Sequence, residues 1–153
     1  MNQGSPHFDV SLERTATPEL VAAFERLLPQ LSSSAPSLSQ EALRRILEMP
    51  GNSVFVARDR TAGGRIVGSL TLVTFRIPTA LRAWIEDVVV DESVRGRGVG
   101  ELLVQAAVAL ARERGAKTID LTSRSSRKAA HRLYEKSGFH VRDTQVYRHG
   151  PKP

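Results

Sequence analysis

The sequence predicts one α/β (α+β) domain, residues 1–153, with a mixed central sheet of about six or seven strands flanked by about four helices. Short β-branched runs of alternating polarity are interspersed with longer runs whose apolar residues recur at helical spacing. One such strand is followed by a glycine-rich turn and a helix, which is how parallel strands are connected. The 153 residues are 41% hydrophobic and 25% charged, which is typical of a globular protein with a full core.

The chain begins with a predicted strand at residues 10–14, followed by a helix that runs to about Leu28. Thr17 precedes Pro18, and this pair reads as an N-cap with proline at the first helical position. Residues 29–36 are rich in serine and proline, which predicts a loop.

A second helix is expected from a capping box at Ser37 and Gln40, and it ends at residues 49–51. Three strands with alternating, β-branched sequences follow. They are residues 53–58, 66–75 and 83–90. The charged, glycine-containing turn between the first two predicts an antiparallel pair, and Gly68 inside the second marks a β-bulge.

Residues 101–114 carry the most regular helical pattern of the chain, and Gly115 follows as a C′ glycine. One face of this helix collects small and branched apolar side chains: Leu102, Leu103, Ala106, Ala107, Leu110 and Ala111. Residues 118–122 form a short strand. Because a helix connects it to the preceding strand, we expect the two to be parallel.

The last part of the sequence predicts a helix at residues 127–136, capped by Ser125 or Ser126 and ended by Gly138. Two closing strands are expected after it, at residues 139–142 and 144–148.

Composition excludes several classes of protein. The chain has no cysteine, which excludes disulfides, thiolate metal sites and a cysteine nucleophile, and no histidine pattern has metal-ligand spacing. No apolar run is long enough to cross a membrane and the first residues are polar, so we expect a cytoplasmic protein. The net charge of +6 suits an anionic ligand, but aromatic residues are only 5%, which is thin for nucleic-acid binding.

The glycine-rich turn at residues 95–100 is the most informative motif. It lies between an apolar strand and a long helix, so it leads into the first turn of that helix. The backbone N–H groups of a first turn form the positive end of the helix dipole. Glycine lets the backbone approach an anion closely. The spacing matches neither a dinucleotide-binding loop nor a Walker A loop. The turn therefore predicts a phosphate site of another kind.

Three segments together resemble the GNAT superfamily of acyl-CoA N-acyltransferases. Arg95, Gly98 and Gly100 fill the fixed positions of its Arg/Gln-x-x-Gly-x-Gly/Ala loop. Residues 85–90 (IEDVVV) look like the strand before that loop, and residues 133–139 (LYEKSGF) look like the family's Leu-Tyr-x-x-x-Gly-Phe segment. Element order and separations also match, from about residue 53 to residue 148.

The resemblance implies a GNAT fold in which strands four and five splay apart and acetyl-CoA, the acyl donor, enters between them. The pantetheine arm would pair with the strand edge and the pyrophosphate would lie on the loop amides. The implied donor-binding residues are Val88, Val89, Val90, Arg95, Gly96, Arg97, Gly98, Val99, Gly100, Arg127 and Tyr134. Arg127 stands where many relatives have asparagine, so contact with a CoA phosphate is expected there instead.

The implied reaction is direct attack of an amine on the thioester in a ternary complex, which needs a base, an oxyanion donor and an acid. Glu86 resembles the base of family members, and Asp87 is the alternative. Neighbours on a strand point to opposite faces, so only one of them is expected to line the site. The resemblance assigns the oxyanion to the backbone amide of Val88 and protonation of the CoA thiolate to Tyr134.

The acceptor is expected to be a primary amine of a small molecule: an amino acid, an aminosugar or a related amine. Candidate acceptor-binding residues are Trp84, Glu86, Asp87 and Tyr147. Two alternatives stay open, acetylation of a protein or peptide amine and a non-catalytic CoA-binding regulatory module. Acyl groups longer than acetyl are also open. Homodimers are frequent in the family, and no feature of this sequence fixes the oligomeric state.

Overall fold

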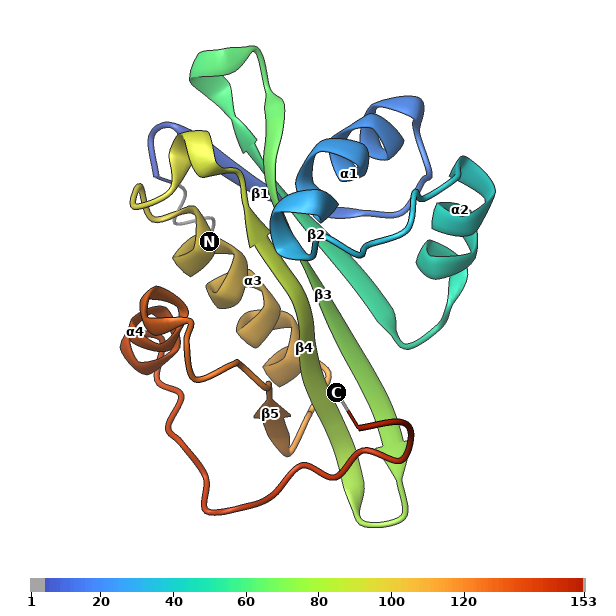
Figure 1. The fold of residues 1–153 in the computed structure, drawn as a ribbon, viewed down its shortest axis with the longest axis vertical. Coiled ribbons are helices and arrows are strands. Elements are labelled where there is room, and N and C mark those ends of the chain that lie inside the picture. Colours follow the sequence, from blue (N-terminus) through green and yellow to red (C-terminus); the bar gives the residue numbers. More distant parts are fainter. Residues whose placement is uncertain (1–4, 153) are drawn as a thin grey trace. The chain divides into compact units, whose positions relative to one another are not determined.

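A five-stranded mixed sheet organises the chain up to Thr122 (Figure 1). The computed structural model describes residues 5–152, which form two compact units that divide between Thr122 and Ser123. The strands are β1 (Phe8–Glu13), β2 (Asn52–Asp59), β3 (Arg65–Ile77), β4 (Ala80–Val90) and β5 (Thr118–Asp120). They lie in sequence order, with β1 to β4 antiparallel and β5 parallel to β4.

The described residues contain four α-helices and two short 3₁₀ turns. The helices are α1 (Pro18–Leu31), α2 (Gln40–Glu48), α3 (Val99–Glu113) and α4 (Lys128–Lys136), and the turns are η1 (Arg60–Ala62) and η2 (Glu92–Val94). Within that part of the chain, none of the helices has the length and apolar character needed to cross a membrane.

The start of α1 confirms its predicted cap, because the Thr17 hydroxyl accepts the Leu20 N–H at 3.2 Å ahead of Pro18. Its end does not follow the prediction. The helix continues past Pro29 to Leu31, since the Leu28 carbonyl accepts the Ser32 N–H at 3.0 Å and the last turn still packs on the core.

The predicted capping box of α2 is wrong. The N-cap is Ser39, whose hydroxyl accepts the Ala42 N–H at 3.1 Å, and not Ser37. Gln40, the expected partner of Ser37, instead donates its side-chain amide to the Ala16 carbonyl at 2.7 Å. This long-range bond links the start of α2 to the segment before α1, which no local pattern reveals.

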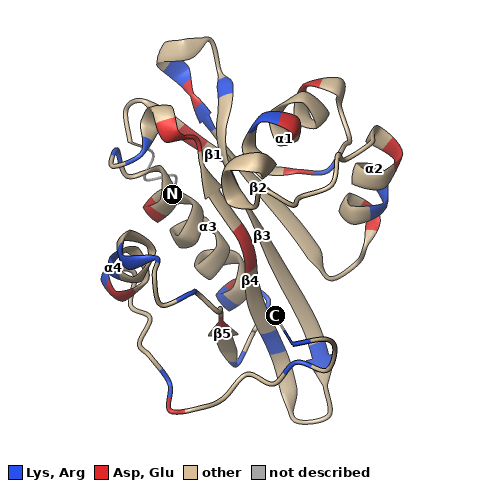
Figure 2. Ribbon diagram, viewed as in Figure 1, with Lys and Arg blue, Asp and Glu red and all other residues tan. Residues whose placement is uncertain are grey.

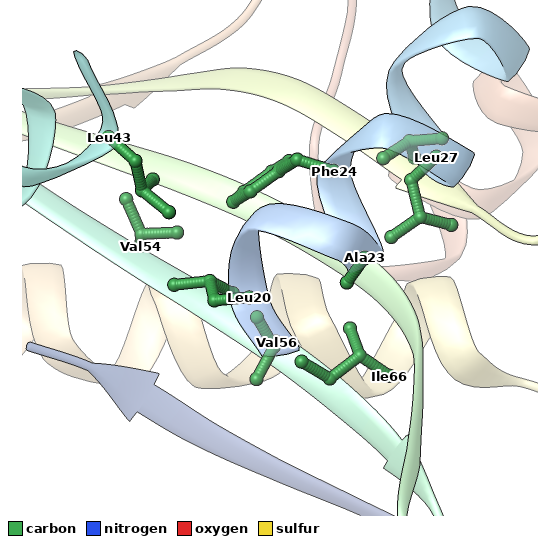
Figure 3. Packing of buried hydrophobic residues seen from close by; sticks show 9 residues of the cluster. Leu20, Ala23, Phe24, Leu27, Leu43, Val54, Val56 and Ile66 are labelled. Carbon is green, nitrogen blue, oxygen red and sulfur yellow. The ribbon is translucent and has the colours of Figure 1, made fainter. Parts of the chain in front are cut away.

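Helices α1 and α2 cover one face of the sheet, and α3 covers the other (Figure 1). The first interface is a cluster of buried residues from α1, α2 and three strands (Figure 3): Leu20, Ala23, Phe24, Leu27, Leu43, Val54, Val56, Ile66 and Val89. On the other face, α3 comes so close to β3 that a β-carbon at Gly68 would lie 3.1 Å from Leu103. The bulge predicted at Gly68 is confirmed by a register shift there, where Val67 is the extra residue.

The second unit contains α4 and an extended segment. Arg127 occupies the N-cap of α4 without a side-chain cap bond, so the prediction that Ser125 or Ser126 caps the helix is wrong. Phe139 folds back on α4, donating its N–H to the Tyr134 carbonyl at 2.9 Å.

No strand forms in residues 139–152, so the two predicted closing strands are wrong and the described chain has five strands rather than six or seven. Val141 and Tyr147 are each 90% exposed. The alternating pattern is present, but a strand also needs a partner that supplies its hydrogen bonds. That the chain forms a single domain stays a prediction.

Candidate active site

The glycine loop between η2 and α3 has the backbone of an anion site. Gly96 and Gly98 have φ of 78° and 85°, in the left-handed region that side chains disfavour. Gly98 is the N-cap of α3, and no side chain caps that end. A β-carbon at either glycine would meet no atom within 4 Å, so the space above the backbone is open. Because the N–H groups at a helix start lack partners within the helix, this end of α3 is suited to bind a ligand oxygen.

Two arginines of the loop tie it to the sheet. The Arg95 side chain donates to the Val90 carbonyl at 3.1 Å, at the end of β4. The Arg97 guanidinium lies 3.8 Å from the Asp59 carboxylate and stacks over the Phe8 ring at 4.8 Å. These contacts hold the loop against the sheet. Both side chains are also exposed, so their positive charge lies at the surface of the loop.

One edge of β4 is unpaired for half its length. Pairing with β5 ends at Trp84 opposite Asp120, the last residue of β5. Residues 85–90 therefore have a strand partner only on the β3 side within the described chain, and Figure 1 shows β5 beside only one part of β4. Here pairing stops between strands four and five, the place where the sequence predicted a splay. The free edge runs straight toward the glycine loop.

A β-bulge interrupts β4 at the centre of this edge. Glu86 and Val89 both pair with β3, and two residues, Asp87 and Val88, stand between them opposite a single β3 residue. Asp87 has a φ of 51°, a left-handed conformation that aspartate tolerates better than most residues. The bulge takes the Val88 amide out of the regular ladder, which is the condition for it to serve a ligand.

The two candidate carboxylates lie together on β4, where they form the acidic band of that strand in Figure 2. Glu86 pairs with Thr71, which in turn pairs with core residue Val54, so Glu86 lies on the face covered by α1 and α2. Both Glu86 and Asp87 are exposed. Asp87 stands opposite Leu70, which alternates with Thr71, so the expectation that only one of the two carboxylates lines the site stays a prediction.

Trp84 shares the face of Glu86, as the register with β3 shows, and it is half-buried. Of the sequence-predicted acceptor residues, Trp84 and Glu86 thus share one face of β4, and Asp87 follows them at the bulge. They adjoin the Val88 amide, the predicted oxyanion donor.

The remaining predicted residues belong to the second unit. Burial raises the pKa of Tyr134, against the opposing charge of Arg127, so the phenol holds its proton at neutral pH. Its ring contacts Phe139 edge-on, with centroids 6.1 Å apart. Tyr147, in contrast, is 90% exposed. The roles of Tyr134, Arg127 and Tyr147 stay predictions.

Sequence reasoning missed a network that holds the end of β4. Asp91 is 4% exposed and accepts hydrogen bonds from the N–H and hydroxyl of Ser93, at 3.0 and 2.8 Å. Arg26 of α1 donates to the same carboxylate at 3.2 Å and also to the Ile66 carbonyl. Next to it, the Gln30 side chain accepts the Glu92 N–H at 2.9 Å. Helix α1 is thus fastened to the segment that leads into the glycine loop.

The pKa of Asp91 reflects this network. Burial alone would raise it, but the hydrogen bonds from Ser93 and Arg26 outweigh burial and lower the pKa. The spacing of Asp91 and Ser93 indicates a local turn that sequence analysis can find. Arg26 lies 65 positions away, and no sequence signal connects it to Asp91.

A cavity of about 660 Å³ lies elsewhere, between the end of β1 and α2. Charged side chains such as Arg14, Glu41 and Arg44 line it, and none of the predicted site residues does. Arg44 is already paired with Glu41 and Glu48. The cavity is thus separate from the predicted site residues of β4.

Known proteins match this chain over most of its length. The model of the Acetyltransferase (GNAT) family matches residues 20–139. A glucosamine 6-phosphate N-acetyltransferase of Trypanosoma brucei brucei is 34% identical over 119 residues, covering 74% of this chain and 79% of that protein. Glucosamine 6-phosphate N-acetyltransferase 1 of Oryza sativa subsp. japonica is 33% identical over 135 residues, covering 84% and 79%.

Solved structures agree with the sequence matches. The crystal structure of an acetyltransferase of Trypanosoma brucei superposes with a TM-score of 0.74 at 29% identity, covering 93% of this chain and 99% of that one. The matched residues 20–139 include the three segments by which the sequence resembles this family, residues 85–90, 95–100 and 133–139. The chain belongs to the GNAT acetyltransferase family.

Proposed function

We propose that the protein transfers an acetyl group from acetyl-CoA to a primary amine of a small molecule, by direct attack in a ternary complex. The observation that carries this proposal is the unpaired, bulged edge of β4 running into an uncapped helix N-terminus. The unpaired strand edge suits an extended chain that carries amide groups, and the helix N-terminus suits a pyrophosphate. CoA contains both groups in that order.

The donor would lie along the free edge. The pantetheine amides would pair with residues 88–90 as an added strand pairs with a sheet. The backbone of residues 96–100 would hold the pyrophosphate, with Arg95 contributing charge. The open space above Gly96 and Gly98 supports this placement, because no protein atom lies within 4 Å of a β-carbon at either position and phosphate oxygens would have room there.

The chemistry would proceed in one ternary complex. An amine of lysine type has a reference pKa of about 10.4, so it must lose a proton before attack, and Glu86 would accept it directly or through water. The nitrogen forms a bond to the thioester carbon, and the oxyanion is stabilised by the Val88 N–H. The C–S bond then breaks, Tyr134 would give its proton to the departing CoA thiolate, and the second proton that the nitrogen loses on forming the amide would pass to solvent, from which Tyr134 is reprotonated.

A small aminosugar or related amine is the acceptor class that the relatives favour. The two curated relatives at 33–34% identity are named glucosamine 6-phosphate N-acetyltransferases, and both match more than two thirds of this chain. The exposed carboxylates of Glu86 and Asp87 would attract the ammonium group of such an acceptor.

The test is acetyl-CoA consumption over a panel of amino acids, aminosugars, aminosugar phosphates, polyamines and peptides. We expect thiol release with at least one small amine. Glu86→Gln should lower kcat by about 10²–10⁴-fold, the usual contribution of a general base, with acetyl-CoA affinity retained. The matched control is Glu113→Gln, an exposed glutamate at the far end of α3. Equal rates for the two variants would remove Glu86 from the mechanism, and no turnover with any small amine would refute the proposal.

A further inference from the structure

We propose that the acceptor carries an anionic group, a phosphate or a carboxylate, and that Arg82 binds it. This inference rests on the proposed function and narrows its substrate class. Arg82 would be a specificity-determining residue at one end of an acceptor-binding row, with Glu86 at the other end and Trp84 between them.

Strand register places the three side chains in one row. Arg82, Trp84 and Glu86 occupy alternate positions of β4 before the bulge, so they share a face. Their partners on β3 are Phe75, Val73 and Thr71, a second alternating set. The regular pairing extends through all three positions, and the row therefore lies entirely on the face of Glu86.

The spacing of the row fits a small molecule. Alternate residues of a strand are separated by roughly 6.6 Å, so the Cα atoms of Arg82 and Glu86 are about 13 Å apart. Both side chains are long and can extend toward each other along the strand. The space then left between the guanidinium and the carboxylate is one that a small molecule of a few bonds can span. The half-buried Trp84 would offer an apolar surface to the carbon skeleton between the two charged ends.

The charge of Arg82 is available to a ligand. Arg26, Arg44, Arg58 and Arg60 each contact a carboxylate of the chain. Arg82 is exposed, and among the residues that the structure describes it makes no ion pair or side-chain hydrogen bond.

A hydroxyl group on the neighbouring strand also lacks a hydrogen-bond partner among the described residues. On β5, Thr118 stands beside it in parallel register, and the buried hydroxyl of Thr118 has no hydrogen-bond partner in the described chain. At the other end of the row, Glu86 is followed by Asp87, and a third carboxylate, Asp120, lies beside Trp84 at the middle of the row. An acceptor with an ammonium group at one end and an anion at the other matches this separation of charge.

The experiment compares acceptors that differ only in the anion. For phosphate, the comparison is glucosamine 6-phosphate against glucosamine. For carboxylate, it is 4-aminobutyrate against 4-aminobutanamide. The wild type should prefer the anionic member of at least one pair by roughly ten- to a hundredfold in kcat/KM, the effect of one charge-assisted contact.

Arg82→Gln should abolish that preference by raising KM for the anionic acceptor, with KM for acetyl-CoA unchanged, and Arg82→Lys should restore part of it. The matched control is Arg76→Gln, because Arg76 is an exposed arginine of the same hairpin that pairs with Leu81 on the opposite face. Its kinetics should equal those of the wild type.

The outcomes separate the two proposals. Turnover of small amines without preference for the anionic members would overturn the role of Arg82 and leave the proposed function standing. The same holds if Arg82→Gln and Arg76→Gln behave alike. Absence of turnover with every amine would overturn both.

Discussion

Substitution of Asp91 by asparagine measures how firmly the end of β4 is held. The residue is 4% exposed and accepts three hydrogen bonds, from the N–H and hydroxyl of Ser93 and from Arg26. Asparagine keeps the size of the side chain and one acceptor oxygen but removes the negative charge. The change therefore weakens the network without opening a cavity.

The magnitude follows from the partners that remain. Hydrogen bonds to a charged group contribute about 1.5–3 kcal/mol. The Arg26 side chain is 31% exposed and stays hydrated in the variant, so we expect a loss near the lower end, about 2 kcal/mol. For a chain of this size, that corresponds to a decrease in Tm of about 4–8 °C.

The loss should also depend on pH. The folded protein lowers the pKa of Asp91 below its ordinary value of 3.8, so the carboxylate contributes stability above that value. This contribution is lost as the pH falls through the folded pKa. The difference in unfolding free energy between the wild type and Asp91→Asn should be full at pH 7 and should shrink as the pH is lowered below 3.8.

Urea unfolding at pH 7, 5 and 3 measures both effects, with Asp143→Asn as the control because Asp143 is an exposed aspartate of the second unit. A loss at pH 7 no larger than that of the control would refute the assigned network. A difference that grows on acidification would refute the assigned direction of the pKa.

Two further predictions concern the donor and the acid. Gly98→Glu should abolish acetyl-CoA binding, because Gly98 has a φ of 85° and a carboxylate there would repel the pyrophosphate; unchanged affinity by calorimetry would mean that the phosphate lies elsewhere. Tyr134→Phe should lower kcat with little change in acetyl-CoA affinity, since Tyr134 is the predicted acid and its raised pKa keeps it protonated; wild-type turnover in stopped thiol-release assays would exclude that role.

Local patterns predicted the features that depend on neighbouring residues. The cap of α1 at Thr17 and the C′ glycine after α3 depend on φ and on hydrogen bonds within one turn, and the structure has both. The glycine loop was likewise found from its own residues, and so was its position before α3.

The features that were missed depend on partners distant in sequence. The bulge at Asp87 is defined by the pairing of β4 with β3, and the sequence of β4 alone does not indicate it. Ser39 rather than Ser37 caps α2, and Gln40 bonds to Ala16, which lies 24 positions away. Residues 139–148 have the alternation of strands but no strand beside them, so the pattern alone was not sufficient.

The bulge in β4 has a consequence for how such a strand can change. Glu86 and Val89 are three positions apart, yet both lie on the face of α1, because the extra residue shifts the alternation by one step. The alternation of side chains after the bulge is thus displaced by one position from the alternation before it. Under the proposed function, Arg82 and Trp84 could be substituted to suit a new amine, with Glu86 kept as the base, while the amides after the bulge keep their positions toward the donor. If the proposed function holds, one strand carries two recognition surfaces that can evolve separately.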